Sequence, residues 1–339
     1  MKIEKIKKKL FEKQDLSCEE AEFLFERILI GEVNELDLCN ILLALKLKGE
    51  TSDEIAAAVK VLDKFKRRFK KALSPAIDTC GTGGDGKNTL NISTAVSIVA
   101  SSAGIPVVKH GNSAQSSKIG SADILEKIGV PVKMDIFEAE KYFENKKFVF
   151  LFAPQFHPAI KKVTPARKKL GIRTIFNFIG PLVNPADPEF QIIGVAHIEK
   201  LETIAEAVKK AGKDNVILYS SEDGFDEISS NSPAHVYEIN GEIKNFKINP
   251  EDFFNPFEMP IVENENDAVE KFKRAISGKD ENLAKLIALN SAIIFYKIEQ
   301  LKSIKEGFEY AFDILKSGKA MEKLNELVNW NLKLQKRRN

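Results

Sequence analysis

The first part of the chain, up to Phe69, carries apolar residues at helical spacing and predicts several short helices. Residues 17–20 and 51–54 each place a Ser or Thr three positions before a Glu, which is the form of a capping box at a helix start. Gly31 and Gly49 interrupt the pattern and mark helix ends. Because these apolar stripes carry no reactive groups, we expect them to form a core or an interface between subunits.

The pattern changes after Ala76, where short apolar runs alternate with helical segments. The segments that we expect to be strands are 107–108, 148–152, 191–195 and 215–219, with helices such as 201–211 between them. Asn240-Gly241 separates two further runs and predicts a hairpin with a type I′ turn. Helical spacing returns near Asp267.

Such alternation is typical of an α/β layer with a largely parallel sheet. The predicted fold is therefore a small N-terminal helical domain followed by a large α/β domain, in which helices flank a central, mostly parallel sheet. We place the small domain at residues 1–72, completed by a helical segment near 165–190, and the large domain at residues 73–339.

Composition excludes several classes of protein. The 339 residues contain 51 Lys and Arg against 49 Asp and Glu, so the net charge of +2 gives no reason to expect a nucleic-acid or membrane partner. Cys18, Cys39 and Cys80 are widely spaced and form no C-x-x-C pair, which indicates neither a disulfide framework nor a zinc site. No apolar run is long enough for a signal sequence or a membrane span. We expect a cytoplasmic protein.

The segment 78–94 is the strongest candidate for chemistry. Four glycines lie within positions 81–86, and such glycines allow positive φ angles and a close approach of main chain to a ligand. A helix is expected at 91–103, with Ser93 and Thr94 in its first turn. Because unpaired N–H groups and the helix dipole attract anions to a helix N-terminus, this segment predicts a site for a phosphate or diphosphate.

Two familiar glycine motifs match this segment by accident. Gly81, Gly83 and Gly86 have the spacing of a dinucleotide-binding loop, but residues 101–108 contain no carboxylate to hold a ribose. Residues 81–87 also resemble a Walker A loop, yet Asn88 stands where a hydroxyl for Mg²⁺ is needed.

Several further motifs follow along the chain. They are Lys109-His110-Gly111-Asn112, Ser116-Ser117-Lys118, Gly120–Glu126, Phe156–Ala159, Arg167, Leu170–Asn177, Gly180–Pro185 and Gly224–Glu227. Together with the glycine loop, they closely resemble the anthranilate phosphoribosyltransferase family of tryptophan biosynthesis, in motif detail from Asp78 to Ser229. The resemblance implies a nucleoside phosphorylase-like, class II phosphoribosyltransferase fold, with a small domain that dimerises to give a homodimer.

The activity that this resemblance implies is transfer of the 5-phosphoribosyl group from phosphoribosyl diphosphate to the amino group of anthranilate, with release of diphosphate. It also implies Mg²⁺, with about two ions per subunit. The positions that match the family's phosphoribosyl diphosphate site are Gly81, Gly84, Asp85, Thr89, Asn91, Ile92, Ser93, Thr94, Lys109, His110, Gly111, Asn112, Ser113, Ala114, Gln115, Ser116, Ser117 and Ser121.

The other implied roles concern the metal and the acceptor. Ser93, Asp226 and Glu227 match the metal ligands, and oxygen ligands of this kind suit Mg²⁺. Gly81, Asn112 and Arg167 match the anthranilate site, with Arg167 facing the carboxylate.

His110 and His157 are assigned to lining of the acceptor site. We assign neither of them as a general acid or base, because an aromatic amine that attacks an oxocarbenium-like carbon needs orientation more than a strong base.

One residue departs from the family pattern. The family loop usually continues Lys-His-Gly-Asn-Arg, whereas Ser113 stands at the position of the arginine. Serine supplies neither the charge nor the paired N–H donors of arginine. Lys109 or Lys118 is a candidate to compensate.

Two other functions remain open at this point. Pyrimidine nucleoside phosphorylases share a similar fold and the Lys-His-Gly-Asn loop, but their chains are longer and their glycine loop lacks the sequence of 78–85. Ser113 also suggests a non-catalytic relative that binds nucleic acid, whereas the near-zero net charge and the Asp226-Glu227 pair argue against it.

Overall fold

The N-terminal helices form where the sequence predicts them. The structure is a computed structural model that describes residues 2–70, 75–114 and 118–338. Its first elements are α1 (Ile3–Phe11), α2 (Cys18–Ile30), α3 (Glu35–Lys48) and α4 (Ser52–Phe65). Both predicted capping boxes are present, at Ser17 with Glu20 and at Thr51 with Glu54. These reciprocal bonds satisfy N–H groups that would otherwise lack partners at the starts of α2 and α4.

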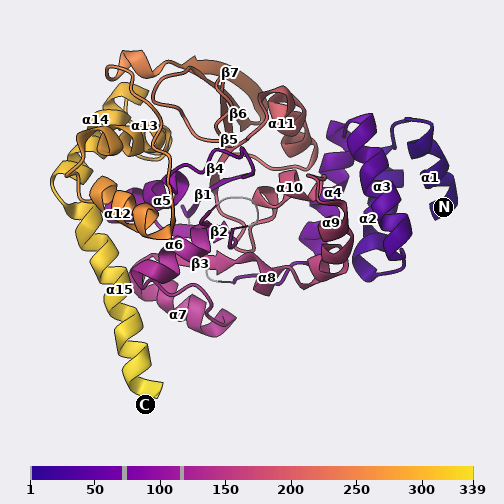
Figure 1. Ribbon diagram of the computed structural model, residues 1–339, viewed down its shortest axis with the longest axis horizontal. Helices are drawn as coiled ribbons and strands as arrows, with labels where there is room; N and C mark the ends of the chain where they lie inside the picture. The colour runs from indigo at the N-terminus through magenta and orange to yellow at the C-terminus, as the bar shows by residue number, and fades with distance from the viewer. Residues whose placement is uncertain (1, 71–74, 115–117, 339) are drawn as a thin grey trace.

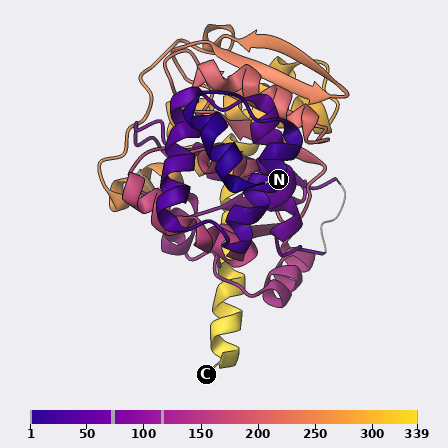
Figure 2. The same cartoon turned by 90° about the vertical axis from the view of Figure 1, so that its right-hand side faces the viewer.

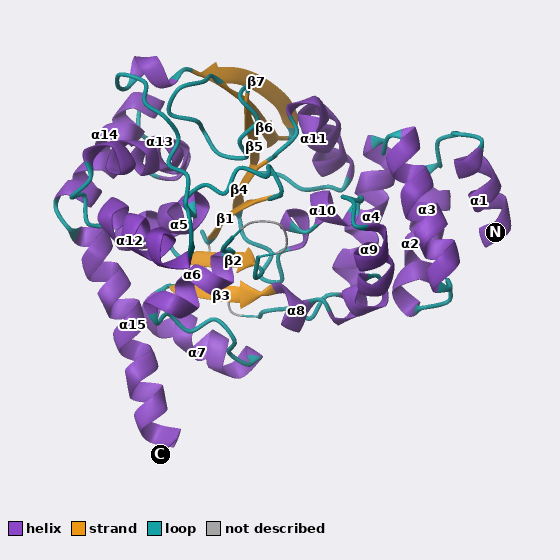
Figure 3. Ribbon diagram, viewed as in Figure 1, coloured by secondary structure: helices purple, strands orange, loops and turns teal. Residues whose placement is uncertain are grey.

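A seven-stranded sheet forms the centre of the rest of the chain (Figure 3). Its strands are β1 (Ile77–Gly81), β2 (Val107–Gly111), β3 (Phe148–Phe152), β4 (Phe190–Gly194), β5 (Val216–Ser221), β6 (Ala234–Asn240) and β7 (Glu242–Ile248). The strand order is β3-β2-β1-β4-β5-β6-β7, with parallel pairing from β3 through β5 and antiparallel pairing of β5, β6 and β7. The prediction of a mostly parallel sheet is confirmed.

The hairpin between β6 and β7 is confirmed, but its predicted turn type is wrong. Asn240 pairs with Glu242, so Gly241 alone connects the two strands. Of these residues only Gly241 has a positive φ, of 67°, whereas a type I′ turn needs two such residues. The Gly241 N–H donates to Asp214 Oδ1 at 2.8 Å, a contact from another part of the chain that local sequence does not reveal.

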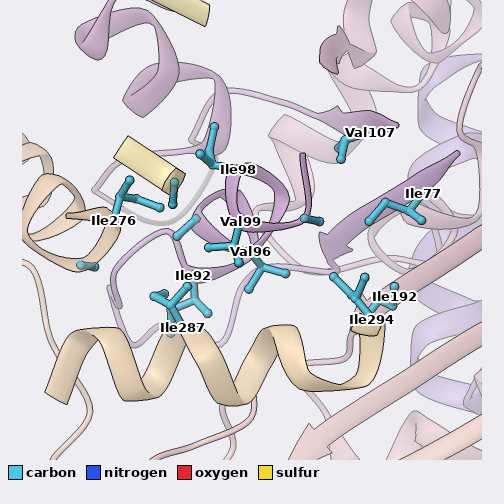
Figure 4. Packing of buried hydrophobic residues seen from close by; sticks show 14 of the residues in the cluster. Ile77, Ile92, Val96, Ile98, Val99, Val107, Ile192, Ile276, Ile287 and Ile294 are labelled. Carbon is cyan, nitrogen blue, oxygen red and sulfur yellow. The ribbon is translucent and has the colours of Figure 1, made fainter. Parts of the chain in front are cut away.

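Helices cover both faces of the sheet because side chains of each strand alternate between the faces. On one face, α5 (Ile92–Ser102) and α13 (Glu281–Ile298) pack with Ile77 and Ile192, as Figure 4 shows. On the other face, α11 (Leu201–Lys210) packs with Ile193 and the neighbouring strand.

The remaining helices pack around the sheet or against the N-terminal helices. They are α6 (Ser121–Ile128), α7 (Ile136–Lys146), α8 (Ala153–Phe156), α9 (Thr164–Leu170), α10 (Phe176–Ile179), α12 (Glu265–Ile276), α14 (Ile304–Lys316) and α15 (Lys319–Arg338), with short 3₁₀ turns at Pro158–Lys162, Pro181–Val183, Ile198–Lys200 and Pro250–Asp252. The end of α15 projects away from the body of the molecule in both Figure 1 and Figure 2.

The N-terminal helices lie at one end of the molecule (Figure 1). There α9 packs against α3, and α10 packs against α4. Their apolar residues share a single core with α11 and one face of the sheet. Within the described part of the chain, no helix has the length and apolar character needed to cross a membrane.

Candidate active site

The candidate site lies at the carboxyl ends of the parallel strands. β1 neighbours both β2 and β4, so the chain leaves it toward one side of the sheet and later returns on the other. In open α/β sheets the crevice at such a switch point is where ligands bind. β1 ends at Gly81, β2 at Gly111 and β4 at Gly194, and the glycine loop follows directly after β1.

The glycine loop adopts the conformation that its glycines allow. Gly83, Gly84 and Gly86 have φ angles of 60°, 77° and 73°, which other residues rarely adopt. Two of the loop's contacts reach the segment after β5. Gly83 N–H donates to Asp226 Oδ2 at 2.8 Å, and Lys87 Nζ donates to the carbonyl oxygen of Asp223 at 2.8 Å while lying over the Phe225 ring. The loop and the Asp226-Glu227 pair are therefore held together, although they are far apart in sequence.

The first turn of α5 presents polar atoms that lack partners. Asn91 is the N-cap residue, yet its side chain makes no capping bond. Asn91 Oδ1, Thr94 Oγ1 and Asp85 Oδ2 are all buried and have no hydrogen-bond partner among the described residues. Buried polar atoms are nearly always paired in native proteins, so these atoms indicate a polar ligand at the helix N-terminus.

Asp226 and Glu227 are buried beside this turn. Glu227 Oε1 accepts the N–H of Ser93 at 3.3 Å, and Glu227 Oε2 accepts the Tyr219 hydroxyl at 3.4 Å. Burial raises the pKa of Asp226 to about 7, with a contribution from the charge of Asp85, and burial with the Asp226 charge raises the pKa of Glu227 well above its usual range. Two buried carboxylates that repel each other are stabilised by a cation.

The donor set of this site fits Mg²⁺. Asp226, Glu227 and the Ser93 hydroxyl supply hard oxygen ligands, and the described residues contain no cluster of three or more acidic, His or Cys side chains that would enclose a metal. Mg²⁺ keeps several waters and binds through one or two carboxylates plus substrate phosphates. An open site of this kind therefore suits it better than a closed cage would.

Lys109 lies at the floor of the site and is held by the protein. Its buried Nζ donates to the carbonyl oxygen of Thr79 and to Ser93 Oγ, the latter at 3.3 Å. Burial lowers the pKa of Lys109, while the charge of Asp78 opposes this shift. Lys109 thus orients the Ser93 hydroxyl that is a candidate metal ligand.

The loop after β2 is tied to the start of α6. Ser113 N–H donates to Asn112 Oδ1 at 2.8 Å, and Ala114 N–H donates to Asp123 Oδ2 at 2.8 Å. Ser121 Oγ donates to the Asn112 carbonyl at 3.3 Å. The candidate ligands Gln115, Ser116 and Ser117 lie outside the described residues.

Two other candidates, Thr89 and Ile92, follow the glycine loop in the chain. The Ile92 side chain is in the core and its N–H donates to the Leu90 carbonyl at 2.7 Å, and Thr89 forms an isolated bridge with Ile261. Of these two residues, Ile92 presents neither its side chain nor a free N–H to a ligand.

Of the candidate acceptor residues, His110 and His157 lie side by side, and Arg167 lies on α9. The rings of His110 and His157 are 5.0 Å apart, and three of their four nitrogens are buried without a partner among the described residues. Burial lowers the pKa of His157 to about 4 and that of His110 well below its usual range, so both rings are neutral at pH 7. Arg167 is half-buried, unlike the exposed lysines around it, and its Nη2 donates to Asn177 Oδ1 at 3.3 Å.

Sequence reasoning gave no role to Arg173, Tyr219 and Lys87, all of which contact the site. Arg173 Nη2 donates to the Thr82 carbonyl at 3.3 Å. The Leu170–Asn177 motif contains Arg173, but its spacing carries no sign that the side chain reaches the glycine loop. Tyr219 lies on β5, and in the sequence it is indistinguishable from an ordinary strand residue.

Fold and site together define a glycosyltransferase that handles a phosphorylated sugar. Residues 73–321 match the model of the glycosyl transferase family α/β domain, and residues 4–65 match that of the family's helical bundle domain.

Comparison with curated relatives identifies the family within this class of glycosyltransferases. Anthranilate phosphoribosyltransferase of Vesicomyosocius okutanii is 41% identical over 97% of this chain and 98% of its own length, and that of Saccharolobus solfataricus is 40% identical over 98% and 96%. The chain belongs to the anthranilate phosphoribosyltransferase family.

Solved structures agree with this assignment. The Thermus thermophilus enzyme has a TM-score of 0.87 at 34% identity, with 96% of this chain and 98% of that chain covered. The Saccharomyces cerevisiae enzyme in complex with PRPP and Mg has a TM-score of 0.87 at 27% identity, with 98% of each chain covered. These findings do not favour the nucleoside phosphorylase and nucleic-acid-binding alternatives.

Proposed function

We propose that this protein transfers the 5-phosphoribosyl group of phosphoribosyl diphosphate to the amino group of anthranilate, in tryptophan biosynthesis. The observation that carries the proposal is the buried Asp226-Glu227 pair, held against a glycine loop whose neighbouring helix N-terminus has unpaired polar atoms. The yeast relative has been solved with PRPP and Mg, and also with 4-fluoroanthranilate, which supports the same two substrates here.

The reaction breaks the bond between ribose C1 and the diphosphate, and forms a bond from C1 to the amine nitrogen. Bound Mg²⁺ neutralises charge on the departing diphosphate, and we assign it to Ser93, Asp226 and Glu227 with about two ions per subunit. We assign the phosphoribosyl diphosphate to the glycine loop, Asn91 and Thr94, and to residues 109–117 and Ser121, because backbone N–H groups of a glycine loop and a helix N-terminus are donors suited to phosphate oxygens.

The acceptor is oriented rather than activated. We assign the anthranilate carboxylate to Arg167, with Gly81 and Asn112 beside the ring, because a guanidinium offers paired donors. His110 and His157 are neutral at pH 7 and line the acceptor side. We assign them to orienting the amine near C1 without carrying a full charge, and the amine passes its proton to the departing diphosphate after the new bond begins to form.

Anthranilate fluorescence tests the function directly. Loss of signal is expected only when protein, phosphoribosyl diphosphate and Mg²⁺ are all present, with one diphosphate released per anthranilate consumed. A folded protein that leaves the signal unchanged refutes the proposal. The Asp226→Asn/Glu227→Gln variant is the matched control, and an unchanged Mg²⁺ titration in it would remove the two residues from the metal site.

We also propose that residues 1–72, with the helical segment near 165–190, form the unit through which two copies associate, and that residues 73–339 form the catalytic unit. Leu36 and Leu47 on α3 are 70% and 69% exposed, and Leu43 between them is 38% exposed. The three lie on one face of α3, opposite its buried residues. An exposed apolar stripe of this kind is typical of a subunit interface.

Light scattering after gel filtration tests the dimer. The wild-type protein is expected to have twice the mass of one chain, and Leu36→Glu/Leu47→Glu is expected to be monomeric. Phe137→Glu is the control, since Phe137 is 71% exposed on α7, a different part of the molecule.

We place the enzyme in the cytoplasm, because its cysteines Cys18, Cys39 and Cys80 are all free thiols.

A further inference from the structure

The side chain of Arg173 covers the glycine loop. Arg173 follows α9 in the chain, and its Nη2 donates to the Thr82 carbonyl at 3.3 Å. A Cβ atom on Gly84 would stand 2.7 Å from Arg173 Cζ and closer still to Nη1. The φ of 77° at Gly84 favours glycine, and the absence of a Cβ atom lets the guanidinium pack against the loop. The two residues occupy one site.

The guanidinium has donors that the described residues do not satisfy. Its Nε and Nη1 are buried and have no hydrogen-bond partner there. Asp85 and Asp226 influence its charge, but neither accepts a hydrogen bond from it. Leaving buried N–H groups of a cation unpaired is costly, so a bound ligand is expected to supply the missing acceptors.

The lysines near the loop are directed at other acceptors. Lys109 Nζ donates to Thr79 and Ser93, and Lys118 Nζ donates to the Val262 carbonyl at 3.2 Å. Lys87 Nζ donates to the Asp223 carbonyl. Lys109 and Lys118, which the sequence suggests as substitutes for the arginine absent at Ser113, are thus both engaged by the protein. Arg173 also donates to the Thr82 carbonyl through Nη2, but its buried Nε and Nη1 point at no protein acceptor in the described parts of the chain.

We propose that the Arg173 guanidinium binds phosphate oxygens of phosphoribosyl diphosphate on the glycine loop through Nε and Nη1. Arginine matches phosphate through two parallel N–H groups, which a serine hydroxyl does not reproduce. The assignment rests on the proposed function. It separates two arginines that lie close together: Arg173 serves the donor substrate at Gly84, and Arg167, bonded to Asn177, serves the acceptor.

Calorimetry with phosphoribosyl diphosphate and Mg²⁺, without anthranilate, tests the contact apart from catalysis. Arg173→Gln is expected to weaken binding about tenfold or more and to raise the KM for phosphoribosyl diphosphate equally, because one or two charge-assisted hydrogen bonds are lost. The KM for anthranilate is expected to change by less than about threefold. Arg173→Lys keeps the charge but not the planar guanidinium, and its affinity for phosphoribosyl diphosphate is expected to lie between those of the wild type and Arg173→Gln.

Arg167→Gln is the matched control. It is expected to raise the KM for anthranilate far more than the KM for phosphoribosyl diphosphate. Unchanged binding of phosphoribosyl diphosphate by Arg173→Gln overturns the inference, as does a rise confined to the KM for anthranilate. If Arg173→Gln fails to fold by circular dichroism, Arg173→Lys carries the same comparison. A wild-type protein that binds phosphoribosyl diphosphate without turnover refutes the proposed function and leaves the Arg173 contact to be judged by binding alone.

Two fragments identify the phosphate that is bound. Inorganic diphosphate carries the leaving group, and ribose 5-phosphate carries the other end of the substrate. Weaker binding of inorganic diphosphate by Arg173→Gln assigns the contact to the leaving group, and weaker binding of ribose 5-phosphate alone assigns it to the 5′-phosphate. Equal affinity of wild type and variant for both fragments contradicts the contact.

Discussion

Gly194→Ala is expected to displace the Asp226 carboxylate without touching any assigned ligand. A Cβ atom on Gly194 would stand 2.7 Å from the carbonyl carbon of Asp226, closer still to its oxygen, and 3.2 Å from Tyr219 Cε2. Real Cβ atoms essentially never approach within 3.0 Å of a non-bonded atom, and the obstacle here is backbone that cannot rotate away. The segment that carries Asp226 must therefore move.

The energetic cost has two parts. Overpacking of a close-packed site costs roughly 1–3 kcal/mol. Loss of the 2.8 Å bond from Gly83 N–H to Asp226 Oδ2 adds roughly 1.5–3 kcal/mol, because the acceptor is a carboxylate. We expect the free energy of unfolding to fall by about 3 kcal/mol, since the two parts overlap when the segment relaxes. The Mg²⁺ concentration that gives half-maximal activity is expected to rise about tenfold.

Urea unfolding and a Mg²⁺ titration of activity measure the two effects. Gly180→Ala is the matched control, because Gly180 has a φ of −51° and no atom nearer than 4.0 Å to the added Cβ. That variant is expected to keep its Mg²⁺ dependence and to gain up to about 1 kcal/mol from a stiffer unfolded chain. Wild-type stability and Mg²⁺ dependence in Gly194→Ala would refute the steric reasoning.

Three further expectations concern other parts of the molecule. The pKa of His157 lies at about 4 in the folded protein and near 6.5 in the unfolded chain, so the unfolded state binds more protons between these values. The free energy of unfolding therefore falls by about 3 kcal/mol as pH falls through this window. His157→Phe should flatten the pH dependence measured by urea unfolding, and equal slopes in wild type and variant would contradict the low pKa of His157. Lys87→Met should raise the Mg²⁺ concentration for half-maximal activity about fivefold, because the glycine loop loses its bond to the carbonyl oxygen of Asp223. Lys87→Arg should keep the wild-type value. An unaffected Mg²⁺ titration of Lys87→Met would argue against a coupling between the glycine loop and the segment that carries Asp223. Glu54→Ala should lower the free energy of unfolding by about 3–5 kcal/mol, because Lys48 Nζ and the N–H groups of Leu16 and Thr51 lose a buried acceptor. A loss below about 1 kcal/mol, measured by urea unfolding, would show that water replaces the carboxylate.

Much of the fold could be predicted because its signals are local. A capping box satisfies N–H groups three residues away, and an apolar run such as 148–152 is buried wherever the sheet forms, so both are visible in a short window of sequence. The turn at Gly241 was predicted with the wrong geometry, since Asp214 binds its N–H from outside any such window.

The sequence by itself determined the elements and the kinds of chemical group available. Glycines at 81–86 and a helix start at Asn91 predicted a phosphate site, because such a loop and a helix N-terminus present backbone N–H groups to an anion, whereas the metal role of the acids at 226–227 was implied by the resemblance to the family. The N-terminal capping and the alternation of strands and helices were determined in the same way, by backbone hydrogen bonds and burial over a few residues.

Only the tertiary structure decided which groups meet. Gly83 bonds Asp226 because β1, β4 and β5 are neighbours in the sheet, an order that no local pattern specifies. The same packing turns Lys109 toward Thr79 and brings Arg173 onto Gly84. The sequence identifies residues that can bind an anion, but the direction of a side chain depends on contacts made across the whole fold. Those contacts leave Arg173 Nε and Nη1 without a protein acceptor among the described residues.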